Sequence, residues 1–164
     1  ADYSRSGGPM FDLHVHDVDV LSWCFGTPSS VACSGDATHF TTLYRFEPGR
    51  RAASPPQHVS AECGWDFAAT GGFRMKYAAV FERATAEFDL SRTPALVLHT
   101  SESSGAVELP PGTGYDGEIR HLVELLASGG QRPIASIEEA AGVIRVLEAE
   151  RDALENGAWT SVRR

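Results

Sequence analysis

Apolar and polar positions follow different periods along the chain, and each period predicts a different part of the fold. Residues 9–25 combine apolar positions with a polar stripe at helical spacing, beginning at Pro9 and ending at Gly26, before Pro28. Proline suits the first turn of a helix, and glycine suits the position that follows a helix. The pattern therefore predicts a helix over 9–25, preceded by a polar tail or linker over 1–8.

The middle of the chain shows short segments in which apolar and polar residues alternate. Such alternation is typical of strands, whose successive side chains point to opposite faces of a sheet. The segments lie at 38–46, 58–67, 73–81, 84–90, 95–100 and 106–109. Because no helical segment separates them, we expect a mostly antiparallel sheet.

The last third returns to helical spacing. Apolar residues recur at this spacing over 116–126, after Asp116, which we expect to cap that helix. Ser136 and Glu139 form a capping-box pattern, which predicts a second helix that ends near Gly157 and leads into a short final strand. The order of elements predicts an α+β fold, in which helices pack on one face of an open, mostly antiparallel mixed sheet.

Length, charge and cysteine content limit the function classes. A chain of 164 residues suits one α+β domain, which we place at 9–164. A net charge of −8 without basic runs argues against nucleic-acid and anionic-membrane partners, and no apolar run is long enough to span a bilayer. The three cysteines form no CxxC pattern. This usage is typical of reduced thiols, so we expect a cytoplasmic protein.

The first predicted helix carries the densest group of chemically active residues. Asp12, His16 and Asp19 follow one another at i, i+4 and i+7, so they share one helix face. Unpaired buried charge is costly, so this stripe faces either solvent or a site. His14 precedes His16 by two positions and faces elsewhere on the helix. We expect His14 to be packed or paired, with the rim of a pocket as the alternative.

Two motifs carry a resemblance to a known family. The spacing of the first is GG-x3-D-x3-H-x2-D-x3-W-x2-G, made by Gly7, Gly8, Asp12, His16, Asp19, Trp23 and Gly26. It resembles the opening helix of the C-terminal domain of the Gfo/Idh/MocA oxidoreductases, the glucose–fructose oxidoreductase and inositol dehydrogenase family. The second motif, Tyr115-x-x-Glu118-x-x-x-Leu122, is similar to the family's Y-x-x-E-x-x-x-F helix, with leucine for the aromatic residue. The stretch over 133–162 resembles the family's terminal helix and strand.

The resemblance implies a two-domain enzyme of which this chain is one part. Family members join an N-terminal Rossmann domain, which binds NAD or NADP, to a C-terminal domain like dihydrodipicolinate reductase's, which supplies much of the substrate pocket. This sequence contains neither the glycine fingerprint of a Rossmann domain nor the family's Glu-Lys-Pro lysine motif. We therefore expect the Rossmann domain outside this chain, no tightly bound nucleotide on it, and no activity of the chain alone. The resemblance also implies a homo-oligomer assembled through the open sheet face.

The resemblance assigns roles to particular residues. Oxidation of a hydroxyl in a sugar, cyclitol or related polyol requires removal of a proton from oxygen, and a histidine suits this task near neutral pH. By the match to the family, His16 is the catalytic residue, with Asp12 beside it, and both contact substrate. Tyr115 is a further candidate for the pocket. For Asp19 we expect a structural role.

Two other interpretations remain open. Residues Asp12 to His16 also form a D-x-H-x-H string, and metal-dependent hydrolases place HxH at the end of a strand, where His14 and His16 would point the same way. The helix-compatible run that follows and the length of the chain argue against such a barrel. The resemblance implies no metal site. The third interpretation is a non-enzymatic assembly domain, whose polar stripe only caps a helix.

Overall fold

The computed structural model describes residues 3–49, 54–129 and 132–163. The chain divides into two compact units. The first consists of 1–67 and 132–164, and the second consists of 68–131. The second unit is thus an insertion in the chain order of the first. The predicted domain over 9–164 contains both units and stays a prediction.

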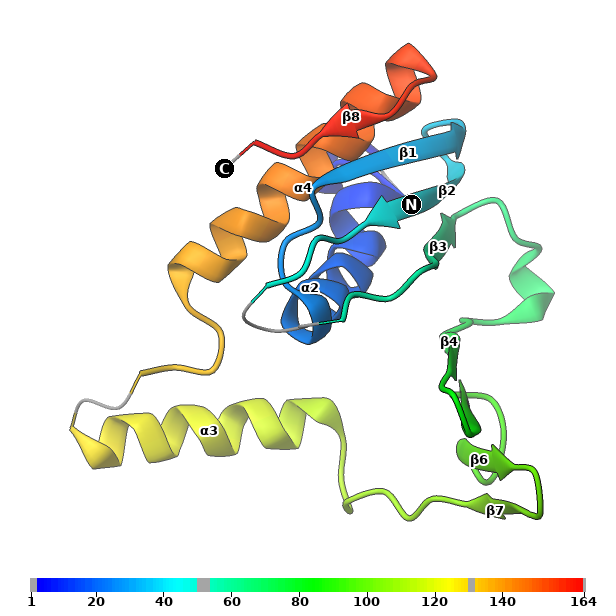
Figure 1. Ribbon diagram of the computed structural model, residues 1–164. Coiled ribbons are helices and arrows are strands. Elements are labelled where there is room, and N and C mark those ends of the chain that lie inside the picture. Colours follow the sequence, from blue (N-terminus) through cyan, green and yellow to red (C-terminus); the bar gives the residue numbers. More distant parts are fainter. Residues whose placement is uncertain (1–2, 50–53, 130–131, 164) are drawn as a thin grey trace. The chain divides into compact units, whose positions relative to one another are not determined.

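The first unit combines a four-stranded sheet with helices. Its elements are α1 (Tyr3–Ser6), η1 (Met10–His14), α2 (Val15–Phe25), β1 (Ser30–Gly35), β2 (His39–Arg45), β3 (Val59–Gly64), α4 (Ile137–Asn156) and β8 (Thr160–Ser161). The strand order is β3-β2-β1-β8, and the pairings between neighbours are antiparallel. Helix α4 lies against β1, and α2 packs on α4 (Figure 1).

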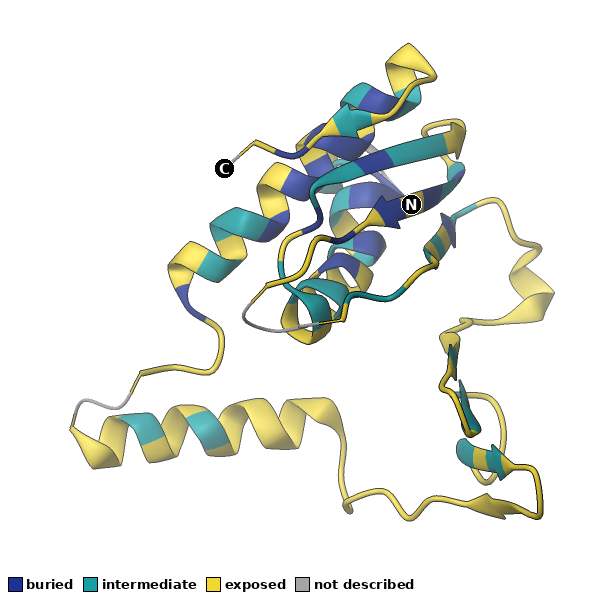
Figure 2. Ribbon diagram, viewed as in Figure 1, coloured by how far each residue is buried: buried dark blue, intermediate teal, exposed yellow. Residues whose placement is uncertain are grey.

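One face of this sheet forms one side of the core. In the register, Val31 lies opposite Tyr44, and Phe40 lies opposite Cys63, so these side chains share a face and are buried. The buried stripe of α4 covers them with Val146 and further residues at helical spacing, and Figure 2 shows the buried positions gathered on these elements. Burial of apolar surface here is the main source of stability.

The predicted helix over 9–25 is present, but it is not uniformly α-helical. Residues Met10–His14 form a π-helical turn, and the α-helix follows from Val15. Such turns are rare and occur mostly as single-turn insertions in helices, often at functional sites. The helix ends at Phe25, as predicted, since Gly26 has a φ of 86°. Part of the predicted tail over 1–8 is the short helix α1, and Ala1 and Asp2 lie outside the described residues.

The second unit contains a separate sheet and one long helix. Its strands are β4 (Lys76–Val80), β5 (Ala84–Asp89), β6 (Leu96–Thr100) and β7 (Ser104–Ala106), preceded by the short helix η2 (Ala69–Gly71). Each of these strands pairs antiparallel with the strand that follows it in the sequence, so the order in the sheet is β4-β5-β6-β7. Helix α3 (Gly114–Ser128) follows. The α+β class is confirmed, and the strands are divided between two antiparallel sheets.

The ends of the two long helices follow from their sequences. At α4 the predicted capping box is present. The Ser136 hydroxyl oxygen accepts a hydrogen bond from the Glu139 backbone N–H, and the Glu139 carboxylate accepts one from the Ser136 backbone N–H. The prediction for Asp116 was wrong in detail. Thr113 is the N-cap of α3, and Asp116 is the third residue of that capping box. Within the described residues, no helix combines the length and apolar character needed to cross a membrane.

Candidate functional site

The structure places the three residues of the predicted stripe on an exposed helix face. Asp12 lies in η1, and His16 and Asp19 lie in α2, all three with exposed side chains. Val20 and Trp23 continue the same face one and two turns further, and they are 58% and 62% exposed. The face therefore combines two acids, an imidazole and large apolar side chains, a mixture typical of surfaces that contact a partner or ligand.

The side chain of His14 points to the opposite side of the helix, into the core. Its side chain is fully buried, in agreement with the expectation that it is packed or paired. The Nδ1 atom lies 3.1 Å from Asp17 Oδ2, and the Nε2 atom lies 2.9 Å from the Tyr44 hydroxyl and 3.1 Å from Glu150 Oε2. The ring also meets the Phe40 ring edge-on, with 5.0 Å between the centroids. The helix start is thus connected to β2 and α4.

Electrostatics in this cluster favour a charged imidazole. Burial by itself would lower the pKa of His14, but the hydrogen bonds and negative charges of Asp17 and Glu150 outweigh burial and raise that pKa to about 9. With both ring nitrogens protonated, Nδ1–H donates to Asp17 and Nε2–H donates to the Tyr44 oxygen, while the Glu150 carboxylate lies beside Nε2 as a buried ion-pair partner. Burial and the carboxylate of Glu150 raise the pKa of the Tyr44 hydroxyl, which therefore stays protonated.

Sequence reasoning missed two members of this cluster, Tyr44 and Glu150. A signal for Glu150 was present, since it follows Val143, Val146 and Leu147 at the spacing of the buried stripe of α4. A charged residue at such a position usually has a buried partner of opposite charge. The sequence offers no comparable signal for Tyr44, because any aromatic residue suits that strand position.

Tyr115, the third predicted site residue, lies in the first turn of α3, within the second unit, and is 76% exposed. The structure brings Asp12 and His16 together on one helix face, and it assigns Tyr115 to a different unit. The roles of these three residues stay predictions.

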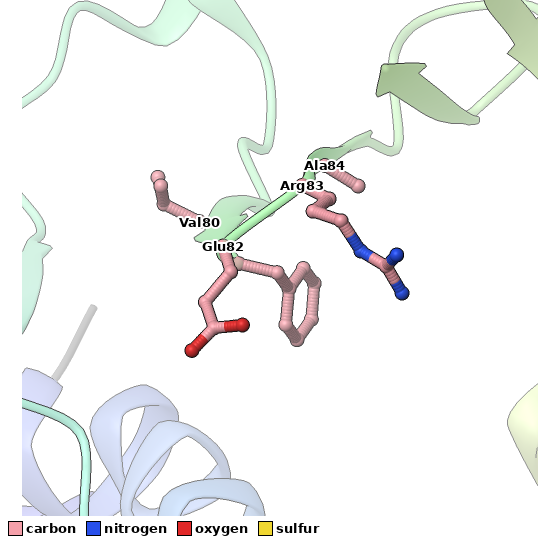
Figure 3. Close-up of a pocket in the computed structure, with 5 residues that line it drawn as sticks. Val80, Glu82, Arg83 and Ala84 are labelled. Carbon is pink, nitrogen blue, oxygen red and sulfur yellow. The ribbon is translucent and has the colours of Figure 1, made fainter. Parts of the chain in front are cut away.

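Two surface depressions contain neither Asp12, His16 nor Tyr115. One lies at the turn between β4 and β5 and is lined by residues 80–84. Figure 3 shows that Glu82 and Arg83 point to different sides there, so they form no convergent polar group. The other lies between α4 and β8 and mixes arginines with acids. Neither depression offers a set of groups for the predicted chemistry.

The metal-hydrolase interpretation requires His14 and His16 to converge. On this helix one side chain is buried and the other is exposed, because residues two positions apart point to nearly opposite sides. Among the residues that the structure describes, no group of three or more histidine, cysteine or acidic side chains is arranged around a common metal position. The geometry thus offers no support for an HxH metal site.

The N-termini of the two long helices do not fit the pyrophosphate of a dinucleotide. A nucleotide pyrophosphate usually binds at a helix N-terminus that follows a parallel strand and a glycine-rich turn. The N-termini of α3 and α4 instead hold the carboxylates of Asp116 and Glu139, which accept from the backbone at Thr113 and Ser136. A carboxylate in that position both fills the donors and repels a phosphate.

The fold is thus of the α+β class with two antiparallel sheets, and a polar pair is exposed on the helical segment formed by η1 and α2. Comparison with protein families matches residues 1–88, more than half of the chain, to the GFO/IDH/MocA C-terminal domain. The chain belongs to this family, and its domain is therefore part of an enzyme family, the oxidoreductases. The predicted family resemblance is confirmed. Comparison with curated proteins gives no significant match.

Solved structures of oxidoreductases resemble this chain over most of its length. An NAD-binding oxidoreductase from Klebsiella pneumoniae matches 99% of this chain and 53% of its own, with a TM-score of 0.74 and 16% identity. Levoglucosan dehydrogenase in complex with NADH matches 95% and 50%, with a TM-score of 0.75 and 17% identity. UDP-N-acetylglucosamine 3-dehydrogenase from Acidithiobacillus ferrooxidans matches 90% and 47%, with a TM-score of 0.68 and 14% identity. The chain spans about half the length of these proteins.

Proposed function

We propose that this chain is the substrate-binding part of an NAD(P)-dependent oxidoreductase that acts on a hydroxyl of a sugar, cyclitol or related polyol. The observation that carries the proposal is the exposed Asp12–His16 pair, which lies on one helix face within the part of the chain matched by the family. Two of the similar structures are dehydrogenases whose names specify sugars, which supports this substrate class.

The pair suits one part of the chemistry. The His16 imidazole accepts the proton that leaves the substrate hydroxyl, and the Asp12 carboxylate accepts a hydrogen bond from a neighbouring hydroxyl and orients the substrate. The nicotinamide, when bound, accepts the hydride. Because the N-termini of α3 and α4 already hold carboxylates, we place the nucleotide site on a Rossmann domain outside this chain. Val20 and Trp23 offer apolar surface for contact beside the pair.

Assembly is the second part of the proposal. In the second unit, the register places Tyr77, Phe88 and Leu96 on one face of the sheet, where the Tyr77 and Phe88 rings stack with 5.3 Å between centroids. Tyr77 is 54% exposed. We propose that this apolar face contacts a second copy of the chain. Cys24, Cys33 and Cys63 are free thiols, which supports a cytoplasmic location.

The experiment uses the full-length protein that contains this chain, with levoglucosan, D-glucose and myo-inositol as substrates and NAD⁺ or NADP⁺ as oxidant. Replacing His16 with asparagine removes the proton acceptor, so we expect kcat to fall roughly 100- to 10,000-fold. The dissociation constant of the nucleotide should change less than about twofold, because the helix face contacts substrate.

The matched control is His58→Asn, since His58 is an exposed histidine of the same unit outside the helix. It should retain full turnover. Unchanged turnover of the His16 variant, or loss of its nucleotide binding, would contradict the assignment. The assembly proposal is tested by light scattering. Tyr77→Asp should convert an oligomer to a monomer. A parent protein that is already monomeric would contradict the proposed contact between copies through this sheet face.

A further inference from the structure

His14 lies at the junction of the two helical segments that carry the proposed site. It is the last residue of η1, which contains Asp12, and α2, which contains His16, begins at the next position. Its imidazole is fully buried, so it cannot contact a substrate that binds on the exposed face. Any influence of His14 on the reaction must therefore act through the position of the helix.

The contacts of His14 come from three elements. Asp17 lies in α2 itself, Tyr44 and Phe40 lie in β2, and Glu150 lies in α4. Glu150 is also fully buried, and its Oε2 lies 3.1 Å from His14 Nε2. The ring thus fixes the helix to both layers of the first unit.

The beginning of η1 is held separately. The thiol of Cys63, in β3, lies 3.6 Å from the carbonyl oxygen of Pro9 and donates to it. The π-helical turn is therefore anchored at both ends, by Cys63 at its start and by His14 at its end. Such anchoring stabilises a turn that the chain alone would seldom adopt.

The helix geometry links these anchors to the outer face. Side chains two positions apart point to nearly opposite sides, so an inward His14 requires outward Asp12 and His16. Rotation of the helix about its axis would move both outer side chains together. For a reacting group, a displacement of about 1 Å can cost about 100-fold in rate.

We propose that His14 and Glu150 form a positioning pair, which holds Asp12 and His16 in the arrangement needed for the reaction. This inference rests on the proposed function of Asp12 and His16. Asp17 and Tyr44 complete the contacts of the ring, but Glu150 is its buried counterion. Loss of a buried counterion leaves the opposite charge without compensation, and the imidazole then leaves its place or loses its proton.

The test compares Glu150→Gln with Glu148→Gln in the full-length protein, using levoglucosan, D-glucose and myo-inositol with NAD⁺ or NADP⁺. Both substitutions remove one carboxylate from α4, but Glu148 is exposed. We expect Glu150→Gln to lower kcat about tenfold, while KM and nucleotide affinity change less than about twofold. A small shift of the helix leaves the substrate within reach of Asp12 but misaligns the reacting atoms. Glu148→Gln should match the parent protein.

A second variant, Tyr44→Phe, removes one hydroxyl contact of His14 Nε2 and keeps the aromatic ring. We expect it to lower kcat about threefold, again without a change in KM. This variant decides the question if Glu150→Gln fails to fold. Unchanged kcat in Tyr44→Phe would then overturn the positioning role.

The outcomes separate the two hypotheses. If His16→Asn retains full turnover, the proposed function fails. If His16→Asn loses turnover but Glu150→Gln matches Glu148→Gln, only the positioning pair fails. If Glu150→Gln lowers kcat, raises KM and weakens nucleotide binding together, the whole fold is disturbed, and that result also overturns the inference.

Discussion

The two units of this chain differ in how they use their apolar residues. In the first unit, β1, β2, β3, α2 and α4 enclose the buried core, and His14 and Glu150 are paired inside it. Among the described residues of 68–131, no side chain is buried, and Figure 2 shows these elements as exposed or intermediate. The second unit nevertheless contains an amphipathic helix, in which Ile119 and Leu126 are 65% and 75% exposed.

The difference shows that secondary structure and stability come from separate sources. Strand pairing and a capping box suffice to define β4–β7 and α3, but burial of apolar surface supplies most of the free energy of folding. The first unit has that surface within itself. The sheet face of the second unit that contains Tyr77 needs cover from outside the unit, which is consistent with the proposed contact between copies.

The largest effect should come from a core truncation in the first unit. Leu147 is fully buried in α4, so Leu147→Ala leaves a cavity, and we expect a loss of about 2–5 kcal/mol in unfolding free energy. The matched change in the second unit is Leu126→Ala. Leu126 is exposed, so its truncation should change stability by less than about 0.5 kcal/mol.

Hydrogen exchange of the full-length protein measures both effects, because it reports opening free energies for each element. The amides of α4, β1 and β2 should lose protection in the Leu147 variant. Equal losses in the two variants would mean that Leu126 is covered in solution as fully as Leu147, and the comparison between the units would no longer hold.

The sequence predicted the type of most of the longer elements, because strand alternation and capping boxes are local signals. It predicted no strand at β1 and no helix at α1 or η2. The capping box at Ser136 and the helix end at Gly26 lie where their residue types predicted them. The π-helical turn over Met10–His14 could not be predicted, since tertiary contacts of His14 and Pro9 stabilise it. The division of the strands into two sheets depends on long-range pairing, which periodicity does not encode.

The candidate site was predictable only where it depends on helix geometry. Spacing alone placed Asp12 and His16 on one face and His14 on another, and the structure has this arrangement. Spacing marks Glu150 as a charge on the buried stripe of α4, but it does not identify Glu150 or Tyr44 as a partner of His14, because both lie 30 or more positions away in the chain. Tertiary contacts of this kind are invisible to local patterns.

The second effect is a dependence of stability on pH that belongs to the first unit. The pKa of His14 rises from 6.5 to about 9 on folding, so the folded state binds the proton more tightly. The resulting stabilisation, about 3 kcal/mol at most, is fully present below pH 6.5 and is lost as the pH rises through about 9. The facing groups are Asp17 on α2, Glu150 on α4 and Tyr44 on β2.

Other groups near the ring stay neutral in this range. Burial raises the pKa of the Cys33 and Cys63 thiols to about 11, and Tyr44 also titrates above the window. Hydrogen exchange of α4, corrected for the intrinsic effect of pH, should therefore show falling stability between pH 6.5 and 9. The same slope in a His14→Gln variant would assign the dependence to another group and contradict the charged imidazole.

The smallest effect compares the two capping boxes, one in each unit. Ser136→Ala removes the side-chain acceptor for the Glu139 backbone at the start of α4, which is packed on β1, so we expect a loss of about 1 kcal/mol throughout the first unit. Thr113→Ala makes the same change at α3. Because α3 buries no side chain, only its first turn should lose protection, while β1 and α4 stay unchanged. Loss of protection in the first unit after Thr113→Ala would mean that the two units fold as one cooperative structure.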